Sequence, residues 1–311
     1  MSVSCVNCTS VSEFILGGLT ETPHLEKVLC SIFFLIYAMN VAGNLSIIII
    51  VALDCNLHSP MYFFLGNLSF LDICFSSVAV PRMLHDFITR QKVISLAACL
   101  AQMHFFHFLG STEVLLLTAM SYDRFIAICR PLHYTEIMNR KLCLTLAIGS
   151  WATGFLHSLL HTISTSLLPF CGPNIVNHFF CDIKPLLKLS CTNTSFNSSL
   201  LLLVTGSLVM ISFLLTLLSY IYIGYTLAWI PSATGRSRGF STCAAHLIVV
   251  ILLYGTALFT YLRPVTEKSI EIDRIAAILF TILTPMLNPI IYTLRNQDVQ
   301  NALVKLANSW I

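Results

Sequence analysis

The chain has 311 residues, of which 56% are hydrophobic and only 10% are charged, and its formal net charge is +3 at pH 7. An average soluble domain carries about 25% charged residues, so this composition predicts a protein surrounded by membrane lipid rather than a soluble domain. The small net charge, without a basic cluster or a P-loop in the sequence, gives no indication of a nucleic-acid partner.

The first 24 residues are polar and contain Asn7-Cys8-Thr9, an acceptor triplet for N-glycosylation. Glycosylation at Asn7 would place this segment outside the cell. No positively charged leader or cleavage site precedes the first apolar run, so we expect that run to anchor the chain without a cleaved signal peptide.

Seven apolar runs follow, and each is long enough to cross a bilayer, which takes about 20 residues as a helix. The predicted spans cover residues 25–53, 60–82, 97–125, 141–164, 197–227, 239–263 and 271–294. Polar or proline-containing connectors separate them, and the sequence shows no second domain. The prediction is an all-α membrane protein, a bundle of seven transmembrane helices in a single domain over residues 1–311.

Residues 295–311 form a short amphipathic segment after the last span. Its apolar positions can share one face of a helix, and they are Leu294, Val299, Leu303, Val304 and Leu306. We expect this helix to lie along the cytoplasmic surface of the membrane.

The cysteines decide the orientation, because the positive-inside rule does not. With the N-terminus outside, eight Lys and Arg fall on cytoplasmic segments and nine on extracellular ones. Cys99, Cys171, Cys181 and Cys191 then share the extracellular side, where disulfides are stable. Four cysteines allow three pairings, and reduced structural thiols are the alternative.

The third span ends in residues 120–129 (MSYDRFIAIC), which place Asp123 and Arg124 side by side at the membrane boundary. Taken alone, the pair could be a basic stop beside a neutralising neighbour. Together with the following Arg-Pro-Leu-His-Tyr, however, the run resembles the signature of olfactory receptors, a branch of the rhodopsin-like G-protein-coupled receptors. Residues 57–65 (LHSPMYFFL), 239–247 (GFSTCAAHL) and 285–296 (PMLNPIIYTLRN) resemble further motifs of that family.

This resemblance implies the disulfides Cys99–Cys181 and Cys171–Cys191. It implies that Asp123 holds Arg124 in the silent receptor and that Arg124 faces a heterotrimeric G protein in the active one. The expected G protein is the stimulatory olfactory type, which raises cyclic AMP from the plasma membrane.

Two tyrosines and one glycine also bear on signalling. Tyr220 and Tyr292 are plausible partners for the released Arg124, and interfacial tyrosines are the alternative. Gly239 stands where the family usually has alanine, which costs roughly 1 kcal/mol of helix propensity.

Four polar residues inside the apolar runs come to one depth, about 10–18 Å from the cytoplasmic helix ends. They are Asn44, Asp72, Glu113 and Asn288. Two carboxylates in one apolar layer need a proton or a cation. We expect sodium between Asp72 and Glu113, as the resemblance also suggests, and a partly protonated hydrogen-bonded network is the alternative.

The ligand site is expected above this layer, in the extracellular half of the bundle. The candidate residues recur at three- and four-residue spacing on the third and sixth spans or approach from the seventh. They are His104, His107, Phe108, Ser111, Tyr254, Ala257, Leu258, Tyr261, Ile278 and Thr281. Core packing is the alternative for each, but buried histidines need partners, and an apolar cavity with few polar groups is typical of small-molecule sites. The expected ligand is small, volatile and oxygenated, and it is not an amine, because the outer third span has no carboxylate.

Other classes of membrane protein fit the sequence less well. A retinal-based pump needs a lysine that the 271–294 span lacks, and a secondary transporter normally shows internal repeats, which we do not find. The polar residues inside the spans offer carboxylates and amides rather than a nucleophile with its base. We therefore expect a receptor without an organic cofactor, and not an enzyme.

Overall fold

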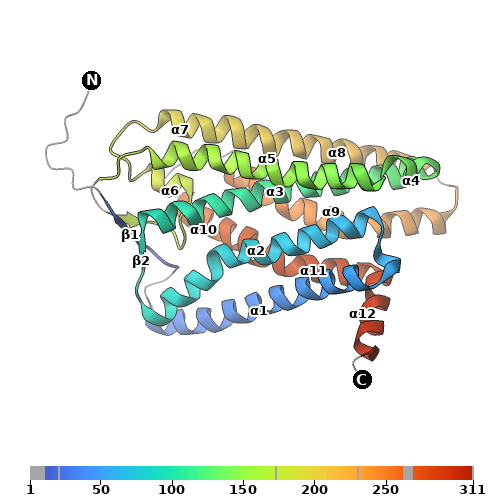
Figure 1. Cartoon of the computed structure of the whole chain (residues 1–311), viewed down its shortest axis with the longest axis horizontal. Coiled ribbons are helices and arrows are strands. Elements are labelled where there is room, and N and C mark those ends of the chain that lie inside the picture. Colours follow the sequence, from blue (N-terminus) through green and yellow to red (C-terminus); the bar gives the residue numbers. More distant parts are fainter. Residues whose placement is uncertain (1–10, 20–21, 172–173, 230, 262–268, 310–311) are drawn as a thin grey trace.

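The structure is a computed structural model that describes residues 11–19, 22–171, 174–229, 231–261 and 269–309. Long helices run side by side along one axis, with the strand β1 (Glu13–Leu16) at one end of the bundle and the helix α12 (Gln297–Ser309) at the other (Figure 1). The predicted seven-helix membrane bundle is confirmed.

The long helices correspond to the predicted spans. The first four are α1 (Pro23–Leu53), α2 (Pro60–Thr89), α3 (Leu96–Cys129) and α5 (Arg140–Ser166), and the sixth is α9 (Ala233–Tyr261). The helix α2 is seven residues longer than predicted, because Pro81 lies inside it without ending it. An ion pair of 2.9 Å between Arg82 and Asp86 supports the additional turns.

The fifth and seventh spans each contain a π-helical segment, whose turns are wider than those of an α-helix. The fifth consists of α7 (Ser195–Leu200), the π-helical segment η3 (Leu201–Thr205) and α8 (Gly206–Ala228). The seventh consists of α10 (Ser269–Ile278), the π-helical segment η4 (Leu279–Leu283) and α11 (Thr284–Arg295). The sequence did not predict either segment.

Local sequence signals explain where these helices begin. Proline occupies the first turn of α1 and α2, where a missing N–H costs nothing. Ser95 caps α3 by accepting from the amide of Ala98, and Asn139 caps α5 by accepting from that of Leu142.

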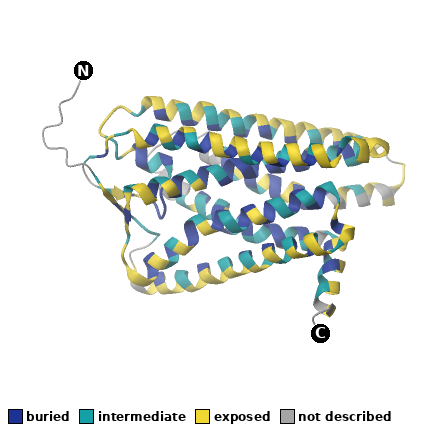
Figure 2. Cartoon of the chain, viewed as in Figure 1, coloured by how far each residue is buried: buried dark blue, intermediate teal, exposed yellow. Residues whose placement is uncertain are grey.

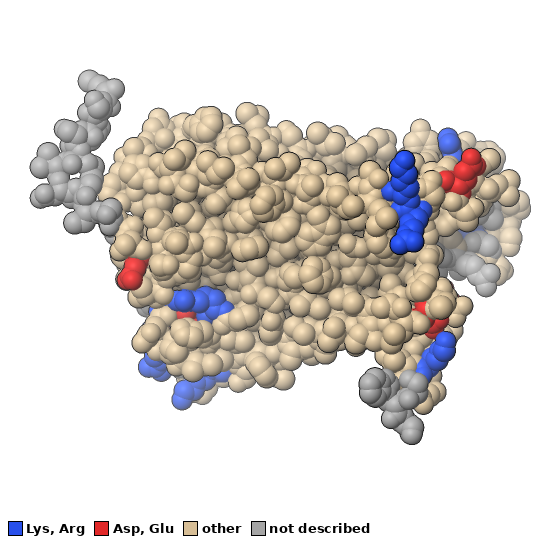
Figure 3. Space-filling model, viewed as in Figure 1, with Lys and Arg blue, Asp and Glu red and all other residues tan. Residues whose placement is uncertain are grey.

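The lateral surface of the bundle is apolar. Buried residues face the interior, whereas large hydrophobic side chains cover the outer faces (Figure 2). On the face in Figure 3, charged side chains gather near the two ends and leave the middle without charge. Among the described residues, five helical stretches combine spanning length with high hydropathy; α3 is not one of them and carries several polar residues.

A small sheet closes one end of the bundle and was not predicted. The strand β1 pairs antiparallel with β2 (Val93–Ser95) and parallel with β3 (Ile175–Val176). Phe14 and Leu16 alternate with exposed residues and pack beneath the sheet, near the short helix α6 (Ile183–Leu187). The strand pairing and the two buried side chains join the N-terminal segment to two interhelical loops.

Short helices lie at the other end of the bundle. The 3₁₀ helices η1 (Cys55–Leu57) and η2 (Pro131–His133) and the helix α4 (Tyr134–Ile137) connect the long helices there. The helix α12 runs across the bundle axis (Figure 1), with Val299 and Ala302 buried and Val304 exposed. The predicted amphipathic C-terminal helix is therefore present.

Candidate functional site

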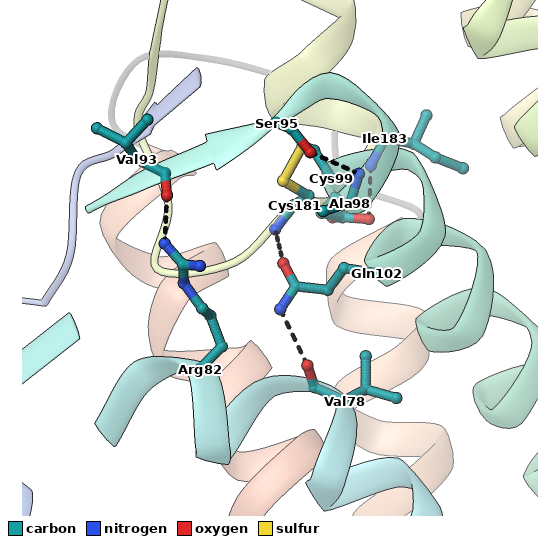
Figure 4. Close-up of a disulfide and its surroundings, with 10 residues drawn as sticks. Val78, Arg82, Val93, Ser95, Ala98, Cys99, Gln102, Cys181 and Ile183 are labelled. Carbon is teal, nitrogen blue, oxygen red and sulfur yellow. Dashed lines mark hydrogen bonds between the residues drawn. A yellow bond between two sulfur atoms is a disulfide. The ribbon is translucent and has the colours of Figure 1, made fainter. Parts of the chain in front are cut away.

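The loop between α5 and α7 is fastened to the top of α3. A disulfide joins Cys99 to Cys181, whose Cα atoms are 5.3 Å apart, as expected. Beside it, the side chain of Gln102 accepts from the amide of Cys181 at 2.9 Å and donates to the carbonyl of Val78 at 2.9 Å (Figure 4). A second pair in this loop, Cys171 and Cys191, has its Cα atoms 5.8 Å apart.

Asp182 continues this attachment toward the interior of the bundle. Its Oδ1 atom accepts from the amide of Ile183 at 2.7 Å and lies 2.9 Å from Nε2 of His107. Burial raises the pKa of Asp182, but the hydrogen bond and the charge of His107 outweigh burial, so its pKa lies below the ordinary value. The loop thus holds an ionised carboxylate on His107.

A small cavity lies near His107, between α3, η3, α8, α9 and η4. Its lining residues are Phe106, His107, Gly110, Ser111, Val114, Thr205, Leu208, Val209, Ala257 and Phe280. The volume is about 20 Å³, which is room for about one water molecule. The surrounding helices must therefore separate before an organic ligand fits.

A chain of hydrogen bonds forms the polar wall of this cavity. Ser111 Oγ lies 2.9 Å from Nδ1 of His157, and Nε2 of His157 lies 2.9 Å from Oγ1 of Thr205. The same Thr205 oxygen lies 3.1 Å from Nε2 of His161. We call these four residues the hydroxyl–imidazole relay, and all of them are buried. The i, i+4 histidines of the fourth span were the available signal in the sequence, but their partners lie on other helices.

Of the expected ligand residues that the structure describes, His107, Ser111 and Ala257 reach the cavity lining. His104 turns toward α5, where its Nδ1 lies 3.1 Å from the hydroxyls of Thr162 and Ser158, and Phe108 packs on Trp151 and Phe155. Successive residues of a helix are rotated by 100°, so His104 and Phe108 project from one edge of the shared face and His107 from the other. The two edges therefore contact different neighbours.

The remaining expected ligand residues lie outside the lining. The hydroxyl of Tyr254 lies 3.0 Å from that of Thr118, and Thr281 donates to the carbonyl of Ala277 at 2.6 Å. Leu258 and Ile278 pack against the core. The side chain of Tyr261 and the whole of Asn7 lie outside the described residues.

The polar layer below the cavity contains hydrogen bonds between helices. Asn288 donates to Oδ2 of Asp72 at 2.8 Å, and Asn44 donates to the carbonyl of Pro285 at 3.0 Å, which has lost its helical donor at Pro289. Glu113 is buried, and the negative charges of Asp72 and Glu113 would repel each other.

The donor set of this layer fits a hard cation with oxygen ligands. Buried oxygens without a partner among the described residues are Asn44 Oδ1, Asp72 Oδ1, both carboxylate oxygens of Glu113, and Asn288 Oδ1. The described residues hold no group of three His, Cys, Asp or Glu suited to a metal. A cation would therefore need two carboxylates and the amide oxygens.

Asp123 and Arg124 lie at the other end of α3, and no ion pair joins them within the described chain. Asp123 instead accepts a hydrogen bond of 2.8 Å from the hydroxyl of Tyr134 in α4. Arg124 lies close enough to Tyr220, His246 and Tyr292 for its charge to act on each of them. The hydroxyl of Tyr220 is hydrogen-bonded to His246, and that of Tyr292 is buried without a partner among the described residues.

Gly239 has a packing role that helix propensity alone does not show. A Cβ atom at this position would clash with Cδ2 of Leu227, a buried residue of α8. The missing side chain therefore lets α9 approach α8.

A cavity with a few polar groups in one half of a seven-helix membrane bundle and a half-buried arginine in the other define a transmembrane receptor. A family model for the olfactory receptor matches residues 33–309. The chain belongs to the olfactory receptor family of G-protein-coupled receptors, which are receptors and not enzymes.

Individual relatives match along nearly their whole length. Human olfactory receptor 12D1 is 53% identical over 98% of this chain and 96% of its own. Human olfactory receptor 12D2 is 52% identical over 96% of this chain and 97% of its own. Mouse olfactory receptor 5G26 is 47% identical over 96% of this chain and 94% of its own.

Proposed function

We propose that this chain is an odorant receptor of the plasma membrane, folded as one receptor domain with its N-terminus outside. It binds small, mostly apolar, oxygenated ligands in the extracellular half and activates a stimulatory olfactory-type G protein, which raises cyclic AMP. Residues 1–24 are extracellular with a glycan on Asn7, and residues 295–311 are a cytoplasmic tail.

The observation that carries the proposal is that one helix, α3, contributes both to the cavity and to the proposed G-protein contact. His107 and Ser111 line the cavity, and Arg124 lies 17 residues beyond His107, which is about 26 Å along a helix. Tyr254 lies between the two ends, because its hydroxyl lies 3.0 Å from that of Thr118 and 3.4 Å from that of Thr216. One residue of α9 is thereby tied to α3 and α8 between the cavity and Arg124.

The small size of the cavity suggests how ligand binding drives the change. A ligand larger than about one water molecule binds only when the lining helices have separated, so it shifts the population toward the expanded state. Leu208, Val209 and Ala257 then exchange contacts with one another for contacts with ligand carbon. Affinity comes mainly from this apolar surface, at about 25 cal/mol per Å².

The polar layer belongs to the same proposal. Asp72 and Glu113 would hold a sodium ion with the amide oxygens of Asn44 and Asn288. The bound ion would neutralise the two carboxylates in the silent receptor.

Arg124→Ala tests the proposed function. Ligand-evoked cyclic AMP should disappear while surface expression is retained, because Arg124 is the proposed contact with the G protein. Arg90→Ala, the same change at the opposite end of the bundle, is the matched control and should leave signalling intact. A full-amplitude response in Arg124→Ala would refute this role.

A further inference from the structure

The hydroxyl–imidazole relay has a property that an ordinary polar wall lacks, because its proton positions are not fixed. A neutral imidazole carries one N–H donor and one acceptor nitrogen, and which nitrogen is which depends on the tautomer. The described partners of His157 are two hydroxyls and no carboxylate, so nothing there compensates for a buried positive charge. His157 is therefore neutral and has two tautomers to choose from.

In the first tautomer, Nε2 of His157 donates to Thr205, and Thr205 donates onward to His161. Nδ1 of His157 then accepts the hydroxyl proton of Ser111. The Ser111 oxygen offers only lone pairs to the cavity, so the matching ligand group is a hydrogen-bond donor such as an alcohol.

In the second tautomer, every bond of the relay runs in reverse. His161 donates to Thr205, Thr205 donates to Nε2 of His157, and Nδ1 of His157 donates to the Ser111 oxygen. The hydroxyl proton of Ser111 is now free to point into the cavity, so the matching ligand group is an acceptor, which is the oxygen of an aldehyde or of an alcohol. In both tautomers the hydroxyl proton of Thr205 stays within the relay.

The orientation of Ser111 agrees with this role. Thr112 and Thr118 on the same helix donate to the carbonyls four residues before them, at 2.8 Å each. Ser111 makes no such backbone bond within the described structure, and its hydroxyl is bound to His157 at 2.9 Å. Its proton is therefore not committed to the helix backbone.

We propose that Ser111 is the specificity-determining group of the cavity, and that the relay lets its hydroxyl either donate to or accept from the ligand. The receptor then takes alcohols and aldehydes of one carbon skeleton with similar potency. This inference rests on the proposed function, and it adds His157, Thr205 and His161 as positioning residues.

Two variants set the relay in opposite directions. In His157→Phe, Ser111 loses its imidazole partner and donates to its own helix, as Thr112 does, so it can only accept from a ligand. Aldehydes should weaken about tenfold, while alcohols change less than about threefold. In Thr205→Val, Nε2 of His157 faces a methyl group and has no hydrogen-bond partner there. An unpaired lone pair costs less free energy than an unpaired N–H, so Nε2 stays unprotonated. The proton then sits on Nδ1, and Ser111 can only donate. Because aldehyde and alcohol oxygens both accept a hydrogen bond, neither class should weaken more than about threefold.

The experiment measures EC50 by cyclic AMP for unbranched alcohols and aldehydes of matched length, from hexanol and hexanal upward, at equal surface expression. The readout is the ratio of the two EC50 values, which a general loss of folding does not change. Thr205→Ser keeps the hydroxyl and should preserve the wild-type ratio. Ser150→Ala, a buried hydroxyl bonded only to the backbone of α5, is a second control.

A ratio that moves toward alcohols in His157→Phe but not in Thr205→Val supports the proposal. If His157→Phe does not reach the surface, His157→Leu replaces it, and the same result is expected. A wild-type preference above about a hundredfold for one member, or a ratio that moves equally in both variants or in neither, would overturn the proposal. A receptor that responds to other odorants but to no member of this panel also overturns it. If no odorant of any class raises cyclic AMP, the proposed function itself fails.

Discussion

The hydroxyl of Tyr134 in α4 lies 2.8 Å from Oδ1 of Asp123 in α3, where it takes the place beside the carboxylate that Arg124 was expected to occupy. Burial, and then the negative charge of Asp123, raise the pKa of Tyr134, so the hydroxyl keeps its proton and is the donor. This bond leaves Arg124 among Tyr220, His246 and Tyr292.

Tyr134→Phe should strengthen the silent state, because Asp123 loses its partner and attracts Arg124 instead. A hydrogen bond to a charged group contributes about 1.5–3 kcal/mol, so evoked cyclic AMP should fall in potency about tenfold or more. The measurement is a dose–response curve at matched surface expression. Tyr225→Phe, at an exposed tyrosine of α8, should have no effect. Higher basal signalling in Tyr134→Phe would contradict this expectation.

Glu113→Gln and Asp72→Asn should each remove any sodium dependence of signalling, since each takes away one of the two charges available to the cation. Basal and evoked cyclic AMP would be measured while sodium is replaced by choline at constant ionic strength. Wild type should respond to the exchange and both variants should not. Identical titrations in all three proteins would favour a protonated network over a sodium site.

Gly154→Ala should destabilise the contact between α3 and α5. A Cβ atom at Gly154 would lie 2.9 Å from the carbonyl oxygen of Phe108 and 3.1 Å from the amide nitrogen of Thr112, so the α3 backbone has to move. Overpacking of this kind costs about 1–3 kcal/mol, which thermal unfolding of the purified receptor would show as a lower Tm. At Gly149 on the same helix, a Cβ atom meets nothing within 4 Å. Gly149→Ala should therefore be neutral or slightly stabilising, and equal Tm values for the two variants would refute the close approach.

Acid should destabilise the loop above the cavity through His178. Burial, opposed by the charge of Asp182 and aided by that of Arg274, lowers the pKa of His178 to about 4. The unfolded chain binds its proton near pH 6.5, so the stability from neutral His178 is present above that pH and is lost as the pH falls toward about 4.

Between pH 7 and pH 5 the expected loss is about 2 kcal/mol. His178→Phe should flatten the dependence of Tm on pH over this interval, whereas His24→Phe, at an exposed histidine, should not. A His178→Phe receptor that loses stability with acid as steeply as wild type would show that other groups cause the loss.

Much of the helical framework could be predicted because hydropathy and turn residues act locally. All seven spans and the C-terminal helix were predicted, and so was the polar layer, because helix length fixes the depth of Asp72 and Glu113. The predicted α2 ended seven residues too early, because a proline inside a helix does not always end it. The strand β1 was missed because four residues carry little periodicity.

The rest depends on contacts between residues far apart in the sequence. His157 and Ser111 are 46 residues apart, and which of them meet is decided by how α3 and α5 rotate about their axes. The same rotation sends His104 and His107, only three residues apart, to different neighbours. Tyr134 belonged to the motif that identified the family, but only the position of α4 shows that it reaches Asp123.

The two π-helical segments give the fifth and seventh helices a tolerance to changes in chain length. A π turn holds one residue more than an α turn, so deleting a single residue within Leu201–Thr205 would leave a continuous α-helix with both flanks facing as before. Within α8 itself, one deletion would rotate all later side chains by 100°. Thr205 belongs to the π-helical segment that the deletion would convert to α-helix, and its side chain would turn away from His157 and His161. Among related receptors, a one-residue difference in this stretch would therefore change which ligands bind without disturbing the end of the bundle that contains Arg124.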